Sequence, residues 1–255
     1  MPAEPQALVV IPARLAATRL PRKPLLEIAG VPMILHVLRR GLEAGLGPVV
    51  VAAADPEIAF TVENAGGRAV LTDPALPSGT DRVLAAAEEI DPARAFDVVV
   101  NLQGDMPEAI PTDLVRAIEP VVADGCDLGT LVVPTDDARE RDDPHVVKAV
   151  VSFVDAAETR GRALYFTRAP APAGPGPLQH HVGIYAYRRD ALERFCDLQP
   201  SPLERRERLE QLRALEAGMS IGVRRIAHAP PGVDTPEDLE AARRRLARRS
   251  AGEPA

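Results

Sequence analysis

The run Leu8-Val9-Val10-Ile11 constrains the fold of this chain more than any other stretch. Consecutive aliphatic side chains, most of them β-branched, predict a strand buried on both faces, which is typical of parallel sheets covered by helices. Pro12 ends the run, and the loop that follows carries the cations Arg14, Arg19, Arg22 and Lys23. Ligands of open α/β sheets bind just beyond the carboxyl ends of the strands. We therefore predict a triphosphate site in residues 12–24, the alternative being a solvated basic loop.

Strand-like and helix-like runs alternate along the first half of the chain. Strands are expected at residues 49–53, 69–71 and 96–102, and helices at residues 32–46, 55–65 and 80–90. The second helix has ordinary start and stop signals, with Asp55 as its cap, Pro56 in its first turn and Gly66-Gly67 at its end. This alternation with short connections predicts a doubly wound, mostly parallel α/β sheet.

The second half of the chain is less regular. Strands are expected at residues 128–133, 146–153, 182–187 and 221–226, and helices at residues 189–196, 202–217 and 235–249. Residues 169–177, APAPAGPGP, are too rich in proline and glycine for regular structure. We expect residues 250–255 to form a frayed tail. We expect a single α/β domain over residues 1–255, with halves at residues 7–125 and 126–249.

Composition argues against several classes of partner. The formal net charge is −7 and aromatic residues make up 3% of the chain. An acidic chain with few aromatic rings is a poor binder of nucleic acid or of an anionic membrane surface. No apolar run approaches the length of a bilayer span, and the N-terminal residues lack the pattern of a signal peptide. We expect a cytoplasmic protein with small-molecule partners, no nucleic acid and no membrane.

Polar residues that could bind a ligand or a metal follow several of the predicted strands. The segment Ser78-Gly79-Thr80-Asp81-Arg82 suits either contact with a phosphate or a base, or an ordinary helix cap. Asp105 follows a strand directly; it is either a natural Mg²⁺ ligand beside a phosphate site or a residue that stabilises a turn. Asp234 precedes the helix start Thr235-Pro236 and offers a second carboxylate for the same metal. Sequence spacing leaves their convergence open.

Six segments, in this order along the chain, carry a resemblance to a known family. They are IPARLAATRLPRKPLLEIAGVPMILHV, PSGTDR, NLQGD, HHVGIYAYR, SPLERRERLEQLR and GVDTPEDLE. Together they resemble the 3-deoxy-manno-octulosonate cytidylyltransferases, also called CMP-Kdo synthetases, over nearly the whole chain. The resemblance implies a mixed sheet of the nucleotide-diphospho-sugar transferase type, with a smaller mixed α/β lobe for sugar binding and dimerisation. Residues 7–125 would then bind CTP and residues 126–249 the sugar.

The resemblance also implies an activity. Members convert CTP and 3-deoxy-D-manno-octulosonate (Kdo) to CMP-Kdo and pyrophosphate, which activates the sugar for lipopolysaccharide synthesis; we expect the same here, with catalytic Mg²⁺ and a homodimer. Three alternatives stay open. One is CTP-dependent activation of another acidic sugar, such as a sialic or 8-amino octulosonic acid. The others are a non-catalytic nucleotide-sugar binding protein and a glycosyltransferase, although no DxD motif follows a predicted strand.

Site residues follow from the resemblance position by position. The nucleotide-binding positions are Pro12, Ala13, Arg14, Arg19, Lys23, Ser78, Gly79, Arg82 and Gln103. The catalytic positions are Lys23, Arg14, Asp105 and Asp234, the two aspartates being the metal ligands. The sugar-binding positions are Arg168, His181, Tyr185, Glu210 and Gln211. The alternative for Tyr185 is a core residue on an alternating strand, and for Glu210 an exposed charge on its helix.

Three features depart from the family pattern. Ala17 stands where a serine is usual, so one side-chain hydrogen bond is lost. Met106-Pro107-Glu108 follows Asp105 where many members have Glu-Pro, which leaves the role of the acidic position open. The loop at residues 169–177 is short and rich in proline, and the sugar-binding assignments near it rest on the least sequence support.

Overall fold

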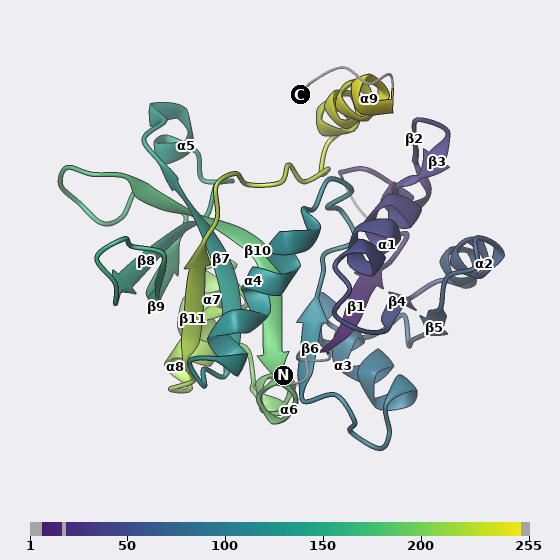
Figure 1. Cartoon of the computed structure of the whole chain (residues 1–255), viewed down its shortest axis with the longest axis horizontal. Helices are drawn as coiled ribbons and strands as arrows, with labels where there is room; N and C mark the ends of the chain where they lie inside the picture. Colours follow the sequence, from purple (N-terminus) through teal and green to yellow (C-terminus); the bar gives the residue numbers. More distant parts are fainter. Residues whose placement is uncertain (1–6, 17–18, 251–255) are drawn as a thin grey trace. The chain divides into compact units, whose positions relative to one another are not determined.

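The computed structural model describes residues 7–16 and 19–250. The chain forms two compact units, each discontinuous in sequence (Figure 1). The first unit comprises the described residues up to 96, residues 101–112 and the residues from 230 onward; the second comprises residues 97–100 and 113–229. These units divide the chain differently from the expected halves at 7–125 and 126–249, because the C-terminal helix belongs to the first unit.

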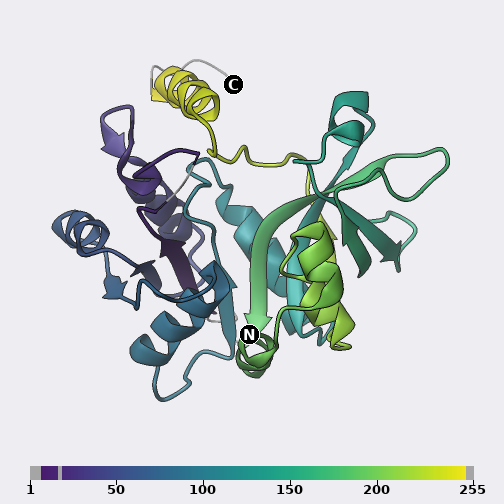
Figure 2. The same ribbon diagram turned by 180° about the vertical axis from the view of Figure 1, so that it is seen from behind.

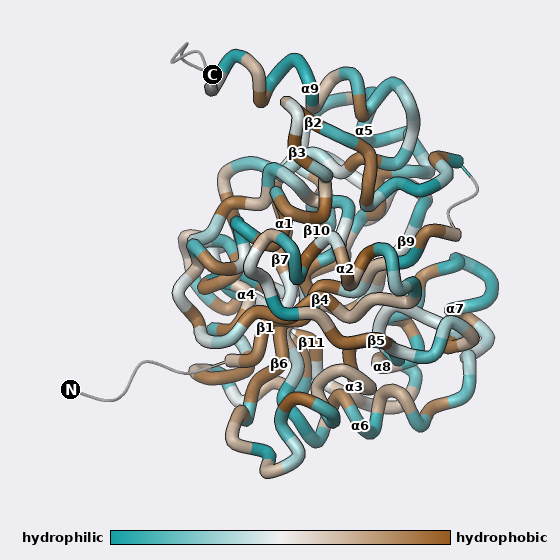
Figure 3. Tube along the Cα trace, turned by 90° about the vertical axis from the view of Figure 1, so that its right-hand side faces the viewer, coloured by the Kyte–Doolittle hydropathy of each residue, from teal (hydrophilic) through white to brown (hydrophobic). Residues whose placement is uncertain are grey.

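The first unit contains parallel strands in the order β5-β4-β1. These are β1 (Ala7–Ala13), β4 (Val49–Ala53) and β5 (Ala69–Leu71), with a separate short antiparallel hairpin of β2 (Glu27–Ile28) and β3 (Val31–Pro32). Val9 lies opposite Val49, and Val51 lies opposite Ala69. All residues of β1 are buried, and the strand is among the brown segments of Figure 3. The predicted doubly covered strand therefore forms the centre of this unit's core.

Helices cover both faces of β1. The helices of the first unit are η1 (Lys23–Leu25), α1 (Met33–Glu43), α2 (Pro56–Asn64), α3 (Gly79–Ile90) and α9 (Pro236–Ser250). A Cβ at Gly41 of α1 would lie 3.6 Å from the Val9 side chain, and one at Gly79 of α3 would lie 3.7 Å from the Pro12 ring. Because side chains alternate along a strand, Val9 and Pro12 point to opposite faces. Helices α1 and α3 therefore pack on opposite sides of β1.

The second unit contains strands in the order β6-β10-β7-β11-β9-β8. They are β6 (Val98–Asn101, whose last residue belongs to the first unit), β7 (Leu128–Thr135), β8 (Lys148–Phe153), β9 (Arg160–Thr167), β10 (Leu178–Arg188) and β11 (Ile221–Arg225). Strand β7 pairs antiparallel with β10 and parallel with β11, whereas β9 pairs antiparallel with both β11 and β8. Strand β8 also pairs with the start of β10, so β7 to β11 form a ring of pairings.

Helices lie on both sides of these strands too. They are α4 (Pro111–Val122), α5 (Ala138–Asp142), α6 (Arg189–Asp197), α7 (Pro202–Glu207) and α8 (Leu212–Glu216). Helix α4 lies on the face of β7 and β10 seen in Figure 1, and α7 and α8 lie on the opposite face, seen in Figure 2. A Cβ at Gly129 of β7 would lie 2.2 Å from the Ala117 carbonyl oxygen. Glycine is therefore required there for α4 to approach the strand.

The expected mixed α/β fold is confirmed, with corrections in the second unit. The sheet is parallel in the first unit, but antiparallel pairs predominate in the second. The expected helix at residues 202–217 is wrong: Arg208 adopts a left-handed conformation with φ of 57°, which separates α7 from α8. Helices α4 and α5 and strand β9 lie in stretches for which we expected no element. Within the described part of the chain, no helix is long and apolar enough to cross a bilayer.

Candidate active site

One pocket of the first unit brings together all the residues expected to bind nucleotide and metal. It has a volume of about 350 Å³, within the range of small-molecule sites. Its lining includes the expected residues Pro12, Ala13, Arg14, Arg19, Lys23, Ser78, Gly79, Arg82, Gln103, Asp105 and Asp234. The remaining lining residues are Ala16, Leu20, Pro24 and Gly104. Segments that are distant in sequence thus meet at the carboxyl end of β1, where the rule for open α/β sheets places ligands.

The basic loop after β1 is anchored at both ends. The Leu15 amide donates a hydrogen bond to Asp55 Oδ2 over 2.8 Å, and the Arg22 amide donates to the Leu15 carbonyl over 3.2 Å. Asp55 occupies the N-cap position of α2 as expected, but its side chain does not cap the helix. It holds the loop instead, a function that sequence reasoning missed. Ala17, where the family has a serine, lies outside the described residues.

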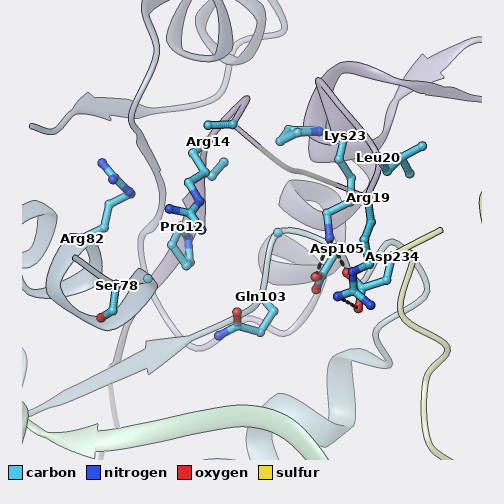
Figure 4. A pocket seen from close by; sticks show the side chains of 15 residues that line it. Pro12, Arg14, Arg19, Leu20, Lys23, Ser78, Arg82, Gln103, Asp105 and Asp234 are labelled. Carbon is cyan, nitrogen blue, oxygen red and sulfur yellow. Dashed lines mark hydrogen bonds and ion pairs between the residues drawn. The ribbon is translucent and has the colours of Figure 1, made fainter. Parts of the chain in front are cut away.

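Lys23 joins the two aspartates that the sequence left unconnected. Its Nζ donates to Asp105 Oδ2 over 2.8 Å and to Asp234 Oδ1 over 2.9 Å, and Arg19 forms an ion pair of 3.0 Å with Asp234 (Figure 4). The alternative of a turn-stabilising Asp105 therefore does not describe its side chain, which points to Lys23. The alternative of a solvated basic loop does not describe Lys23, whose side chain is largely buried; the triphosphate site stays a prediction.

These contacts determine the charge states at this end of the pocket. Burial lowers the pKa of Lys23, but Asp105 and Asp234 outweigh it and raise the pKa above its usual value. Burial raises the pKa of Asp234, but Lys23 and Arg19 together bring it below its usual value. At neutral pH the lysine is therefore an ammonium and Asp234 a carboxylate. The lysine offsets the repulsion between two carboxylates that share one small volume.

Positive charge gathers at the other end of the pocket, where Figure 4 shows Arg14, Arg82 and Ser78. Arg82 is 2% exposed, and its guanidinium donates to Thr72 Oγ1 over 2.5 Å and to the Asp73 carbonyl over 3.0 Å. Burial, and then the positive charge of Arg14, lowers the pKa of Arg82. The charges of Asp55 and Asp73 oppose this shift without cancelling it, so the repulsion between Arg14 and Arg82 remains, and a bound anion would relieve it.

Ser78 and Gln103 line the pocket and also make structural hydrogen bonds of their own. The Ser78 hydroxyl accepts hydrogen bonds from the amides of Thr80 and Asp81 over 3.1 and 3.2 Å, so the helix-cap alternative is correct, although the residue also lines the pocket. Gln103 Nε2 donates to Asn101 Oδ1 over 2.9 Å. The cap at Ser78 starts α3 beside the pocket, where the positive end of the helix dipole favours phosphate.

The residues expected to bind sugar lie in the second unit. Arg168 is bonded by its guanidinium to backbone carbonyls: to Glu207 and Pro144 over 2.8 Å each, and to Arg208 over 3.4 Å. Its own amide donates to the Glu207 carboxylate over 3.0 Å. Arg168 thus ties the end of β9 to the turn after α7. Three of its five N–H donors are used in this way.

His181 and Tyr185 belong to an aromatic cluster on β10. Their ring centroids are 5.4 Å apart, and Phe166 packs edge-on against His181 at 5.0 Å. The register of β10 against β7 shifts between Val182 and Tyr185. Tyr185 therefore does not follow the simple alternation on which the core alternative rested, but its ring packs against His181 and Tyr187 and only a minor part of the residue is exposed. Burial raises the pKa of Tyr185 well above its usual value, so the hydroxyl stays protonated.

Glu210 and Gln211 lie in the turn between α7 and α8. Glu210 is half-buried, and its Oε1 lies 3.8 Å from Arg213 Nη2. It therefore does not lie on an exposed helix face, as the alternative assumed. Gln211 is 7% exposed and is the residue before α8. The charge of Glu210 contributes to the pKa of Tyr185, so these two residues are near each other. Arg168, which contacts the same turn, completes a group of polar residues whose role in sugar binding stays a prediction.

We predict that His181 makes the protein acid-sensitive. Burial lowers its pKa from 6.5 to about 3, so below pH 6.5 the unfolded chain binds a proton that the folded chain excludes. The free energy of unfolding therefore decreases as the pH falls, by about 1.4 kcal/mol per unit from this residue. Urea denaturation at pH 6.5 and 4.5 measures this slope, and His181→Gln is expected to reduce it. The interpretation is wrong if the variant keeps the wild-type slope.

The sequence reading also left open the acidic position after Asp105. Glu108 is buried, accepts a hydrogen bond from Arg245 Nε of α9 and forms an ion pair with the same guanidinium. Gly104, in the same segment, is explained by a close contact: a Cβ there would lie 2.7 Å from the Pro12 carbonyl oxygen. Close approach of the segment around Gly104 to the end of β1 therefore depends on a missing side chain. The NLQGD motif already contained this glycine. The contact between Glu108 and Arg245, in contrast, joins residues far apart in sequence, and no local sequence signal indicates it.

Comparisons with known proteins find relatives over nearly the whole chain. A family model described as cytidylyltransferase matches residues 8–221. A 3-deoxy-manno-octulosonate cytidylyltransferase of Parvibaculum lavamentivorans is 59% identical over 95% of this chain and 93% of its own length. One of Rhodospirillum centenum is 57% identical, covering 97% of this chain and 96% of the relative.

Two solved structures resemble this chain over most of its length. The structure of a CMP:2-keto-3-deoxy-manno-octonic acid synthetase complexed with CTP superposes with a TM-score of 0.86 at 40% identity, covering 96% of this chain and 99% of that one. A nucleotidyl transferase from Methanothermobacter thermautotroptrophicus superposes with a TM-score of 0.58 at 18% identity, covering 96% and 99%. The second likeness is one of fold alone.

Proposed function

This chain belongs to the 3-deoxy-manno-octulosonate cytidylyltransferase family, and from that premise we propose that it converts CTP and Kdo to CMP-Kdo and pyrophosphate. The product is the activated sugar for lipopolysaccharide synthesis. The observation that carries the proposal is the pocket in which Lys23 joins Asp105 and Asp234, with Arg14 and Arg82 in the same lining. A triphosphate with a divalent cation has the charge distribution that this lining complements.

The pocket's donor set fits Mg²⁺. This ion is usually bound through one or two carboxylates together with substrate phosphates and water. Asp105 and Asp234 supply two carboxylates within reach of a single nitrogen atom. Within the part of the chain that the structure describes, no third acidic, histidine or cysteine side chain joins them in a metal-binding cluster. We assign Asp105 and Asp234 as the residues that would hold Mg²⁺.

The reaction is an in-line displacement at phosphorus. The 2-hydroxyl oxygen of Kdo bonds to the α-phosphorus of CTP, the bond from that phosphorus to the bridging oxygen of the β-phosphate breaks, and the hydroxyl proton passes to solvent. The chemistry that Mg²⁺ supplies when bound is neutralisation of phosphate charge and a lower pKa of the attacking hydroxyl. The residues position the substrates and offset charge, as in other phosphoryl transfers.

Individual residues have distinct tasks in this proposal. Lys23, Arg14 and Arg19 bind the triphosphate, and Lys23 exchanges its bonds to the aspartates for phosphate oxygens. The start of α3 with Ser78, Gly79 and Arg82, together with Gln103, contacts the cytosine and ribose. The remaining N–H groups of Arg168 hold the sugar carboxylate, for which a planar guanidinium is well suited. His181, Tyr185, Glu210 and Gln211 line the sugar site. We further propose a cytoplasmic homodimer with a doubly wound nucleotide-binding half and a sugar-binding and dimerisation half.

We predict that Gly104→Ala lowers kcat/KM for CTP by about 10²-fold. The new methyl group would press on the Pro12 carbonyl oxygen and displace Asp105 or the end of β1, and small displacements in such sites have effects of this size. Initial rates of pyrophosphate release measure the loss. Gly232→Ala is the matched control, because a Cβ at Gly232 meets no atom within 4 Å. Equal rates for both variants would show that the close approach at Gly104 is not needed.

A pyrophosphate-release assay tests the proposed function. The purified protein is incubated with Mg²⁺ and Kdo, and with CTP, ATP, GTP or UTP in parallel. We expect release with CTP and Kdo, and with no other nucleotide at a comparable rate. Replacing Kdo by sialic acid or an 8-amino octulosonic acid tests the other acidic sugars. CTP binding without pyrophosphate release would support a non-catalytic binding protein, and consumption of CMP-Kdo would support a glycosyltransferase.

A further inference from the structure

Glu108 is a buried carboxylate close in sequence to a proposed metal ligand. It follows Asp105 by one short turn, and its side chain is 2% exposed. Its Oε1 accepts a hydrogen bond from Arg245 Nε over 2.8 Å and lies 2.7 Å from Arg245 Nη2. A carboxylate that is removed from water needs such a partner, because an unpaired buried charge is strongly destabilising. The turn that carries Asp105 is therefore bonded to α9.

The other end of the same helix carries the second proposed ligand. Asp234 directly precedes α9, and the Asp238 carboxylate accepts hydrogen bonds from the amides of Asp234 and Thr235 over 3.0 and 2.9 Å. The amide of Val233 donates to the carbonyl of Asp105 over 2.9 Å. Asp234 is thus fixed to the start of α9, and α9 is bonded to the Asp105 segment at two places, near Val233 and through Arg245.

Apolar packing holds the helix to the loop that carries Lys23. A buried cluster contains Leu20, Ile28, Met33, Val233, Leu239 and Ala242, and Leu26 and Leu246 pack against it. Leu20 and Leu26 flank Lys23 in sequence, whereas Leu239, Ala242 and Leu246 belong to α9. One helix therefore contacts the segments that carry Lys23, Asp105 and Asp234.

We propose that the ion pair between Glu108 and Arg245 positions α9 so that Asp105 and Asp234 can share one divalent cation. The inference rests on the proposed function. In the structure Lys23 also holds the two carboxylates together, but in the proposed reaction the lysine bonds to phosphate. The carboxylates repel each other once it leaves. The bond from Glu108 to Arg245 does not involve Lys23, and it maintains the spacing when the lysine moves.

Metal binding to an Arg245→Ala variant tests this proposal. Electron paramagnetic resonance measures free Mn²⁺ in the presence of CTP and without sugar, so the readout does not depend on turnover. We expect Arg245→Ala to bind Mn²⁺ about 10 to 100-fold more weakly than the wild type, the usual effect of losing a residue that orients metal ligands. The affinity for CTP without metal stays unchanged. Arg244→Ala is the control, since Arg244 is an exposed residue of the same helix, and it keeps wild-type Mn²⁺ affinity.

A double variant separates positioning from stability. Arg245→Ala leaves the Glu108 carboxylate buried without its partner, which lowers the free energy of unfolding. Glu108→Gln combined with Arg245→Ala removes that charge, so the free energy of unfolding recovers while Mn²⁺ affinity stays weak. Recovery of Mn²⁺ affinity in the double variant, or wild-type affinity in Arg245→Ala, overturns the proposal. If the wild-type protein itself binds no Mn²⁺ with CTP, the proposed function fails instead.

Discussion

Asp105→Ala is expected to abolish Mg²⁺-dependent pyrophosphate release while the protein stays folded. The side chain is partly exposed and contacts Lys23, so its loss removes no part of the hydrophobic core. Losing one of two metal ligands removes several kcal/mol of charge stabilisation, which corresponds to a rate about 10³-fold lower or more. Initial rates with CTP and Kdo at saturating Mg²⁺ measure the effect.

The control for this variant is Asp136→Ala. Asp136 is an exposed aspartate of the second unit, and its removal is expected to leave the rate unchanged. Circular dichroism and thermal unfolding establish that both variants are folded. Near-normal turnover by a folded Asp105→Ala protein would refute the metal assignment, because the reaction would then proceed with Asp234 as the sole proposed ligand.

Lys23→Ala is expected to lower the rate by about 10²-fold or more, as observed when one preorganised donor is removed from a site that stabilises developing charge. The structure gives this residue two tasks. It offsets part of the negative charge of Asp105 and Asp234 in the free protein, and in the proposed reaction it bonds to the triphosphate. The variant should therefore lose affinity for CTP as well as turnover, and kcat and KM measured separately will show both.

Arg39→Ala is the matched control for Lys23→Ala. Arg39 is an exposed cation of α1 in the same unit, so its loss tests whether the overall charge of the unit matters. We expect a rate within about threefold of the wild type, since exposed charges at a distance are screened by salt. If Lys23→Ala itself lowers the rate by less than about threefold, the loop after β1 is ordinary surface.

Most helices and strands of the first unit could be predicted because their signals are local, although η1 and the hairpin of β2 and β3 were not expected. The aliphatic run at residues 8–11, the cap at Ser78 and the proline at position 236 each act within one turn or strand. The second unit depends on antiparallel partners far apart in sequence, which periodicity does not identify. The break between α7 and α8 follows from one backbone angle at Arg208, and nothing in the charged run around it indicates a left-handed residue.

The site shows the same division between local and tertiary information. Each charged residue was identified by its place after a strand or before a helix. Their meeting was not predictable from spacing, since Lys23 is separated from Asp105 by 82 positions and from Asp234 by 211. Asp55 was expected to cap a helix, and only tertiary structure places the Leu15 amide beside its carboxylate. The sugar-binding assignments rest on resemblance. The structure adds that the Arg168 guanidinium donates hydrogen bonds to the backbone carbonyls of Glu207 and Pro144.

The affinity for Mn²⁺ in the presence of CTP, measured by electron paramagnetic resonance on the wild type, Asp105→Asn and Asp234→Asn, tests the central claim most directly. Asparagine keeps the size of each side chain and removes its negative charge. If two aspartates from distant segments hold one ion on the triphosphate, each substitution weakens Mn²⁺ binding by about tenfold or more, and neither changes CTP binding without metal as strongly. Wild-type Mn²⁺ affinity in either variant would contradict the claim.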